Sequence, residues 1–301
     1  MLYHGQGGRQ KTAFSERGAT ENMNIIEIEN LESEELAIYA HATEAELLHY
    51  NEPDTGVFMA ETANVVLRAL EAGYRVVSML VEKGRMKTEA EPVFEKIRAL
   101  YGEEALEGIP VYTAPHEVVT TLTGYNLVRG LWAVMDRKPL QSLEEFCADK
   151  NRIAVLYDVV NPTNVGAIIR SAAALGMDGV ILTDTSVNPL TRRSSRVSMG
   201  TVFQIPWTVT HLAGELPEVL GGYGFSTAAM ALTANSVPPD FAELKNEKRM
   251  AVFLGTEGTG LPDDIISACS YRVMIPMYHG VDSLNVGAAG AVIFWELCRQ
   301  K

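Results

Sequence analysis

Three segments in the second half of the chain hold the residue types that bind and transform ligands: 161–170 (NPTNVGAIIR), 254–262 (LGTEGTGLP) and 275–287 (IPMYHGVDSLNVG). Their glycines let the backbone approach a ligand closely, and their asparagine, serine and glutamate side chains donate or accept hydrogen bonds. Each segment follows an apolar stretch with the composition of a strand. Because ligands of parallel α/β sheets bind at the carboxyl ends of strands, we expect the three segments to form one site.

Arg170, at the end of the first segment, stands among apolar residues at helical spacing. This position predicts a buried guanidinium, which a packed helix tolerates only where an anionic group meets it. The partner is either a carboxylate of the protein, such as Glu257, or an anionic group of a substrate.

Several common catalytic motifs are missing from the sequence. It contains no G-x-x-x-x-G-K-S/T, no H-E-x-x-H and no G-x-S-x-G, and the glycines of 255–260 do not have the G-x-G-x-x-G spacing. These observations disfavour hydrolases and dinucleotide-dependent dehydrogenases. The three cysteines (Cys147, Cys269 and Cys298) form no C-x-x-C pair, and the six histidines do not cluster. We therefore expect no metal, no disulfide framework and a reducing, cytoplasmic environment.

The charge of the chain is acidic and uneven. The net charge is −13; residues 1–150 carry 14 Lys+Arg against 25 Asp+Glu, and residues 151–301 carry 11 against 13. Such a balance argues against a protein that coats nucleic acid non-specifically. A local basic patch can still bind RNA, and the candidate patch consists of Arg192, Arg193 and Arg196 in the segment TRRSSR.

The 301 residues suffice for one large domain or two modest ones, and alternating strand and helix patterns predict an α/β protein. We expect a disordered polar tail (1–22), with Met23 a possible start of the folded protein, then a substrate-binding domain (23–136), a linker with a short helix (137–152) and a second domain (153–301). No apolar run approaches the ~20 residues of a membrane span. The expected strands are 74–82, 109–114, 130–136, 153–159, 179–184, 202–207, 224–230, 250–255 and 271–276, and the expected helices are 62–73, 91–102, 116–124 and 283–300.

The three segments resemble motifs one to three of the SpoU (TrmH-like) branch of the SPOUT RNA methyltransferases. The first family motif, N-x-G-A-x-x-R, matches Asn164 to Arg170. The second, G-x-E-x-x-G-L, matches Gly255 to Leu261. The third, I-P-M followed by S-L-N-V, matches Ile275–Met277 and Ser283–Val286, and residues 196–206 also resemble the family. The motifs occur in the family order over about the last half of the chain.

The first half is similar, more faintly, to the substrate-binding domain that often accompanies this family and that resembles a small ribosomal RNA-binding protein. The similarity lies in residues 56–82 and 122–137. The chain departs from the family pattern at Thr62, where a glycine usually follows the glutamate. It departs again at Gly287 and Ala288, where the family usually has serine and valine.

The resemblance implies a parallel-sheet α/β domain with a deep trefoil knot. It also implies homodimers formed through that domain, with each site completed across the interface. S-adenosyl-L-methionine would bind in the knot against main-chain atoms of Leu254, Gly255, Ile275, Met277 and Leu284. The product would be a 2′-O-methylated ribose in structured RNA, with no DNA or membrane partner.

The resemblance makes Arg170 the key catalytic residue, either for positioning and proton abstraction or for electrostatic stabilisation alone. The other candidates are Asn164, Glu257, Ser283 and Asn285. The asparagines are alternatively loop caps, and Ser283 is alternatively the N-cap of the last helix.

We expect ribosomal RNA as the substrate, with transfer RNA as the alternative within the same class; a resistance-type enzyme that modifies ribosomal RNA is a further possibility. Two other classes remain open from the sequence. They are a non-catalytic RNA-binding protein that keeps the knotted fold and an unrelated small-molecule α/β enzyme.

Overall fold

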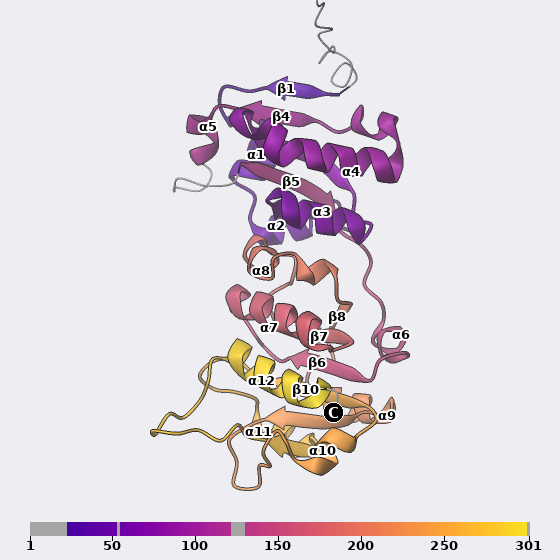
Figure 1. Cartoon of the computed structure of the whole chain (residues 1–301), viewed down its shortest axis with the longest axis vertical. Coiled ribbons are helices and arrows are strands. Elements are labelled where there is room, and N and C mark those ends of the chain that lie inside the picture. The colour runs from indigo at the N-terminus through magenta and orange to yellow at the C-terminus, as the bar shows by residue number, and fades with distance from the viewer. Residues whose placement is uncertain (1–22, 53–54, 122–129, 300–301) are drawn as a thin grey trace, which may run out of the picture.

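The computed structural model describes residues 23–52, 55–121 and 130–299, which form two α/β units stacked along the long axis of the molecule (Figure 1). Residues 23–136 make up the N-terminal unit and residues 153–299 the C-terminal unit. The segment between them runs down one side of the molecule and carries the short helix α6 (Leu143–Cys147) (Figure 1). The tail 1–22 and the segment 122–129, on which several sequence predictions fall, lie outside the described residues.

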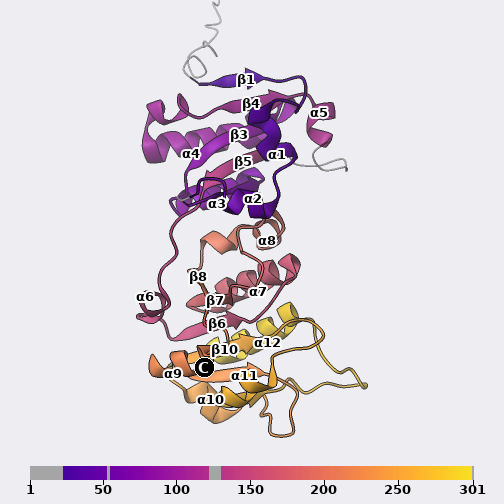
Figure 2. The same cartoon turned by 180° about the vertical axis from the view of Figure 1, so that it is seen from behind.

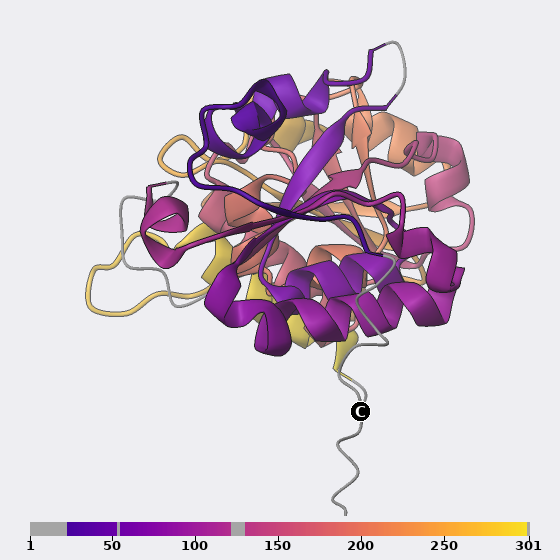
Figure 3. The same ribbon diagram turned by 90° about the horizontal axis from the view of Figure 1, so that it is seen from above.

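The N-terminal unit is a five-stranded sheet in the order β1–β4–β3–β5–β2, in which β5 runs antiparallel to its two neighbours. Helices cover both faces of this sheet: α3 and α4 lie on one face, and α1 and α2 lie on the other (Figures 2 and 3). The strands are β1 (Ile25–Glu27), β2 (Val57–Glu61), β3 (Val76–Glu82), β4 (Val111–Ala114) and β5 (Leu131–Asp136). The helices are α1 (Ala37–Ala40), α2 (Glu44–Leu48), α3 (Ala63–Glu71), α4 (Glu91–Tyr101) and α5 (His116–Thr120).

The C-terminal unit is a six-stranded parallel sheet in the order β11–β9–β10–β6–β7–β8. The central strands are continuous apolar runs because helices cover both faces of the sheet. The strands are β6 (Arg152–Leu156), β7 (Gly179–Thr183), β8 (Trp207–Thr210), β9 (Ser226–Met230), β10 (Met250–Leu254) and β11 (Tyr271–Val273). The helices are α7 (Pro162–Leu175), α8 (Arg192–Val197), α9 (Leu216–Gly222), α10 (Ala242–Asn246), α11 (Asp263–Ala268) and α12 (Val286–Cys298).

The helix α7 shows why the sequence folds as it does beside the first motif. Asn161 is its N-cap, and the side chain accepts a hydrogen bond from the backbone N–H of Thr163 at 2.9 Å. Pro162 occupies the first helical position, where the backbone N–H that proline lacks would have no helical partner. The helix ends at Gly176, which adopts the left-handed conformation (φ +90°).

Most of the predicted elements are present with shorter ends, and one prediction is wrong. The strand expected at 202–207 is instead a 3₁₀ helix (Thr201–Phe203), which follows the left-handed Gly200, and β8 begins only at Trp207. Pro206 separates the two elements, because its nitrogen cannot donate to a strand ladder. Two further strands, β1 and β2, were not among the predicted elements. The α/β class with a parallel sheet is confirmed, and the trefoil knot stays a prediction.

The described part of the chain contains no helix that combines the length and the apolar character needed to cross a bilayer.

Candidate active site

The three motif segments meet at the carboxyl edge of the parallel sheet, as the sequence predicted. The first follows β6 and opens α7, the second follows β10, and the third connects β11 to α12. Order along the sheet places β10 beside β6, so the first two segments are neighbours. The third segment extends away from the body of the unit before it returns to α12 (Figures 1 and 2).

One polar residue from each segment contributes to a single hydrogen-bonded cluster. The Asn164 side-chain amide donates to Glu257 Oε1 at 2.5 Å. The Asn285 amide donates to the same carboxylate oxygen at 2.8 Å and lies 3.0 Å from Asn164 Oδ1. Asn164 is buried, whereas Glu257 and Asn285 are exposed. The cluster therefore joins three distant parts of the sequence and fixes the orientation of both amide groups.

The glycines of the second segment have a backbone role. A Cβ atom on Gly255 would lie 2.4 Å from the carbonyl carbon of Gly260. The backbone at residue 255 can therefore pass this close to the backbone at residue 260 only because residue 255 is glycine. The segment between them is a tight loop in which the Gly260 N–H donates to the Thr256 carbonyl at 3.1 Å. Gly258 and Gly260 both have positive φ. The spacing of the three glycines thus shapes a loop that holds Glu257 at its edge.

A cavity of about 630 Å³ opens under this loop. Residues of the second and third segments line it, together with the segment that follows β9. Its walls combine apolar side chains with main-chain groups, which is typical of sites for small organic ligands. All five residues predicted to hold the cofactor line this one cavity: Leu254, Gly255, Ile275, Met277 and Leu284.

A second cavity of about 570 Å³ lies next to the first. It is lined by residues 159–164 and by Arg193, and it shares Thr256 and Glu257 with the first cavity. Glu257 therefore stands at the border between two spaces, each large enough for part of a nucleotide, and Asn164 meets it there from the second cavity.

The expectation that Arg170 is buried is wrong for the chain described here. Arg170 is exposed, and within the described residues it has neither an ion-pair nor a hydrogen-bond partner. The reason is helical geometry: α7 buries Ile168, Ile169 and Ala172, and Arg170 lies about 200° around the helix from Ile168. Glu257 accepts instead from Asn164, which excludes the predicted Arg170–Glu257 pair in this structure.

The capping alternatives are resolved by the start of α12. Asn285, not Ser283, is its N-cap, and its Oδ1 accepts from the Gly287 N–H at 2.9 Å. Asn285 is thus both a helix cap and a member of the cluster. Ser283 is exposed and lines the first cavity. Asn164 lies inside the first turn of α7, where Asn161 provides the cap.

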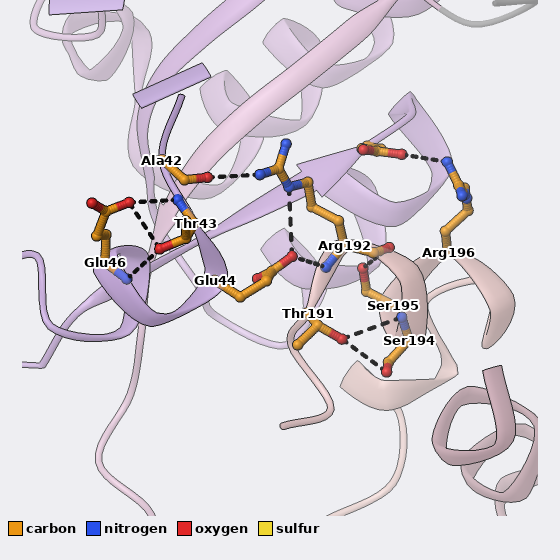
Figure 4. Close-up of polar contacts among 10 residues, drawn as sticks. Ala42, Thr43, Glu44, Glu46, Thr191, Arg192, Ser194, Ser195 and Arg196 are labelled. Atoms are coloured by element: carbon orange, nitrogen blue, oxygen red, sulfur yellow. Dashed lines mark hydrogen bonds and ion pairs between the residues drawn. The ribbon is translucent and has the colours of Figure 1, made fainter. Parts of the chain in front are cut away.

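The arginines of the candidate basic patch have protein partners. Arg192 and Arg196 contact acidic residues of the N-terminal unit, Glu44 and Glu61 (Figure 4). Arg193 has no carboxylate partner among the described residues; its Nε donates to Thr163 Oγ1 at 2.8 Å, at the wall of the second cavity. Of the three, Arg193 is therefore the one that the structure directs toward the site.

Sequence analysis missed one wall of the first cavity. Residues 230–233, which follow β9, line it beside the second motif. The segment contains no motif, but the rule that drew attention to the other loops also applies to it, because it follows a parallel strand.

Comparison with known proteins agrees with this arrangement. A profile described as the SpoU rRNA methylase family matches residues 151–295. An uncharacterised tRNA/rRNA methyltransferase of Mycobacterium tuberculosis is 36% identical over 197 residues, which cover 64% of this chain and 67% of that protein. A 23S rRNA (guanosine-2′-O-)-methyltransferase of Acinetobacter baylyi is 27% identical over 233 residues, covering 75% of this chain and 90% of that protein.

The fold has close counterparts among solved structures. An rRNA methyltransferase from Sinorhizobium meliloti, crystallised with S-adenosylmethionine, superimposes with a TM-score of 0.74 at 23% identity, covering 92% of this chain and 98% of that chain. The superposition spans both units, so the arrangement of an N-terminal unit before a SPOUT-type unit is shared. The chain belongs to the SpoU rRNA methylase family, as its three motifs predicted.

Proposed function

We propose that the protein transfers a methyl group from S-adenosylmethionine to a ribose 2′-hydroxyl of RNA. The observation that carries the proposal is the pair of adjoining cavities with Asn164 and Glu257 at their border. The first cavity suits the methyl donor and the second suits the target nucleotide. Membership of a family of RNA methylases supports the same activity.

The residues of the first cavity fit the cofactor. Its volume lies within the ~300–1,000 Å³ range of small-ligand sites. Leu254, Ile275 and Leu284 offer apolar surface to an adenine ring, and backbone groups of the glycine loop can read its nitrogen atoms. Asp263 and Asp282 add carboxylates on the lining, which suit the cationic groups of S-adenosylmethionine. When bound, the cofactor supplies an electrophilic methyl group on a sulfonium ion.

The side chains around the border hold the reacting hydroxyl in place. Two amide donors fix the orientation of the Glu257 carboxylate, and burial fixes the Asn164 side chain. These two groups therefore offer the ribose hydrogen-bond partners in one defined geometry. Ser283 on the cavity wall offers one more hydroxyl contact. The ribose oxygen takes the methyl group as its proton leaves, and positioned polar groups lower the barrier to that loss.

Arg170 is the residue we assign to the proton and to the adjacent phosphate. A guanidinium has a pKa of ~12.5–13.8, so it accepts a proton only in surroundings that disfavour its charged form; otherwise it stabilises the developing negative charge. Its exposure on α7, away from the Asn164 cluster of the same chain, supports the idea that it acts in the site of a second copy. The exposed Trp295 and Val292 of the neighbouring α12 give a homodimer apolar surface to bury.

The proposed target class rests on the relatives of this chain. Similarity to a 23S rRNA methyltransferase favours ribosomal RNA, and relatives named for both tRNA and rRNA keep transfer RNA as the alternative.

The described cysteines are free, which fits action in the reducing cytoplasm.

The test is methyl transfer from labelled S-adenosylmethionine to ribosomal and transfer RNA prepared from cells that lack this protein. Label in one RNA class, lost in Arg170→Ala, is the expected result. Arg170→Ala should still bind the cofactor, because Arg170 lies outside the first cavity. Full turnover in this variant would remove Arg170 from the reaction. Binding of cofactor and RNA with no label in any RNA, naked or assembled into subunits, would indicate a non-catalytic binder.

A further inference from the structure

The short helix α8 lies between the N-terminal unit and α7 (Figure 1). On the α7 side the contact is very close: a Cβ atom on Gly166 would lie 2.6 Å from the Ser194 carbonyl oxygen and 2.9 Å from Val197 Cβ. Ser194 Oγ also donates to the Pro162 carbonyl at 3.0 Å. These contacts fall on the first turns of α7 on either side of Asn164, so α8 fixes the part of α7 that carries the cluster.

The opposite side of α8 is held by acidic side chains of the N-terminal unit (Figure 4). The Arg192 backbone N–H donates to Glu44 Oε1 at 2.9 Å, and its guanidinium donates to the Ala42 carbonyl at 2.8 Å. Arg196 forms an ion pair with Glu61 Oε2 at 2.8 Å. The Glu61 side chain is 15% exposed and the Arg196 side chain 45% exposed, so water reaches this pair mainly from the Arg196 side.

Apolar packing supports the polar contacts. The rings of Phe58 and Tyr74 in the N-terminal unit and Phe203 in the C-terminal unit form a triangle, with centroid separations of 5.2–5.7 Å. Arg68 of α3 donates to the Met199 carbonyl just after α8. Buried residues of both units belong to one continuous apolar cluster. A shared core of this kind opposes the independent domain motion that separate units usually show.

We propose that Arg192 and Arg196 are positioning residues for the proposed methyl transfer. The N-terminal unit holds α8 through Glu44 and Glu61, and α8 in turn sets the position of the first turns of α7. The geometry of Asn164, and through it that of Glu257, therefore depends on a unit whose described residues line neither site cavity. This inference rests on the proposed function, and it assigns the two arginines a role other than phosphate binding.

Charge reversal at Arg196 distinguishes a positioning role of this residue from a phosphate-binding role. Arg196→Glu places a second carboxylate beside Glu61 and should push α8 away from the end of β2. Since a displacement of about 1 Å can cost 10²-fold in rate, we expect kcat to fall at least about tenfold, with unchanged affinity for S-adenosylmethionine. The swapped double variant Arg196→Glu/Glu61→Arg restores the ion pair and should restore most of kcat. Lys96→Glu, which reverses the exposed Lys96–Glu71 pair within the N-terminal unit, is the matched control and should leave kcat unchanged.

A phosphate contact would give a different pattern. Arg196→Glu would then raise KM for RNA with little change in kcat, and the swapped variant would not recover, because position 196 would still carry a carboxylate. That result would overturn the proposal. Arg196→Gln, which removes the charge but not the bulk of the side chain, provides the same comparison with a smaller effect if the reversal does not fold.

Amide hydrogen exchange tests the coupling without RNA or cofactor. Backbone amides of residues 165–172 should exchange faster in Arg196→Glu than in the wild type and return to wild-type rates in the swapped variant. Unchanged exchange would contradict the coupling even if every RNA proved a poor substrate. Absence of methyl transfer by the wild type, together with the expected exchange pattern, would instead refute the proposed function and leave the coupling in place.

Discussion

Thr62 is held in a backbone conformation that threonine rarely adopts. It joins β2 to α3 with φ +83° and ψ 144°, close to a region of conformational space that is almost restricted to glycine. Its side chain is buried, and its hydroxyl oxygen has no hydrogen-bond partner among the described residues. The related family pattern has glycine here, and the structure gives the physical reason: the turn from strand to helix requires this φ. We predict that Thr62→Gly stabilises the protein.

The expected size follows from four contributions. Release of backbone strain contributes about 1–3 kcal/mol, and removal of a buried hydroxyl without a partner contributes about 1–3 kcal/mol. Glycine costs about 0.5–1 kcal/mol in chain entropy, and loss of the buried methyl group costs about 0.8 kcal/mol. Together these contributions give a net gain of roughly 0–5 kcal/mol, centred on about 2 kcal/mol, in the free energy of unfolding.

The assay is denaturant or thermal unfolding of the wild type, Thr62→Gly and Thr62→Ala. Thr62→Ala removes the hydroxyl but keeps a Cβ atom, so it isolates the backbone contribution. At an ordinary φ, alanine is more stable than glycine by about 0.4–1 kcal/mol, whereas at this φ glycine should be more stable by about 1–2 kcal/mol. A glycine variant less stable than the alanine variant would refute the positive φ of Thr62 and with it the explanation of the family pattern.

Three further predictions concern the site and the core. Gly166→Ala should lower the free energy of unfolding by about 1–3 kcal/mol, because its methyl group meets the Ser194 carbonyl; a urea titration measures this, and an unchanged midpoint would mean that α7 and α8 are not in close contact. Asn285→Asp should weaken S-adenosylmethionine binding about tenfold in calorimetry, because it replaces the amide donor to Glu257 with a second carboxylate while keeping the helix cap. Unaltered affinity would mean that the hydrogen-bonded cluster does not shape the cofactor cavity. Burial raises the pKa of the Cys147 thiol to about 11, so this thiol stays protonated at pH 8; mass spectrometry after iodoacetamide treatment of the folded protein should find it unmodified, and rapid alkylation would contradict its burial.

The convergence of the three motif segments could be predicted because it depends on a topological rule. Segments that follow parallel strands share one edge of the sheet, so Asn164, Glu257 and Asn285 could be assigned to one site from their places in the sequence. The sequence allows Glu257 to hydrogen-bond either Asn164 or Arg170, and the structure selects Asn164. This choice, and the bond from Asn285, depend on loop conformations set by the close approach at Gly255. The sequence offers Asn285 either as a loop cap or as a contact to the substrate or methyl donor; in the structure it caps α12 and also donates to Glu257.

The sequence predicted a buried Arg170 because its neighbours along the chain are apolar. That composition does not say on which face of the helix Arg170 lies. Apolar neighbours in sequence are neighbours in space only on one face, and Arg170 points away from the face that Ile168 and Ala172 bury. The TRRSSR segment presents the same difficulty. A cluster of arginines has the same sequence signature whether it meets phosphates or carboxylates, and Glu44 and Glu61 lie more than 130 residues away from it along the chain.

The ion pairs at α8 also bear on how so acidic a protein would handle RNA. Glu44 and Glu61 neutralise Arg192 and Arg196. In the described part of the chain, Arg193 at the second cavity and Arg170 on the exposed face of α7 have no carboxylate partner. With a net charge of −13, the remaining surface repels a polyanion wherever these cations do not meet phosphates. An RNA that docks in the correct register brings its phosphates to these arginines. An RNA that docks in any other register has its phosphates repelled by the acidic surface. The acidic surface would then raise selectivity for one shape of RNA, at the cost of affinity for RNA in general.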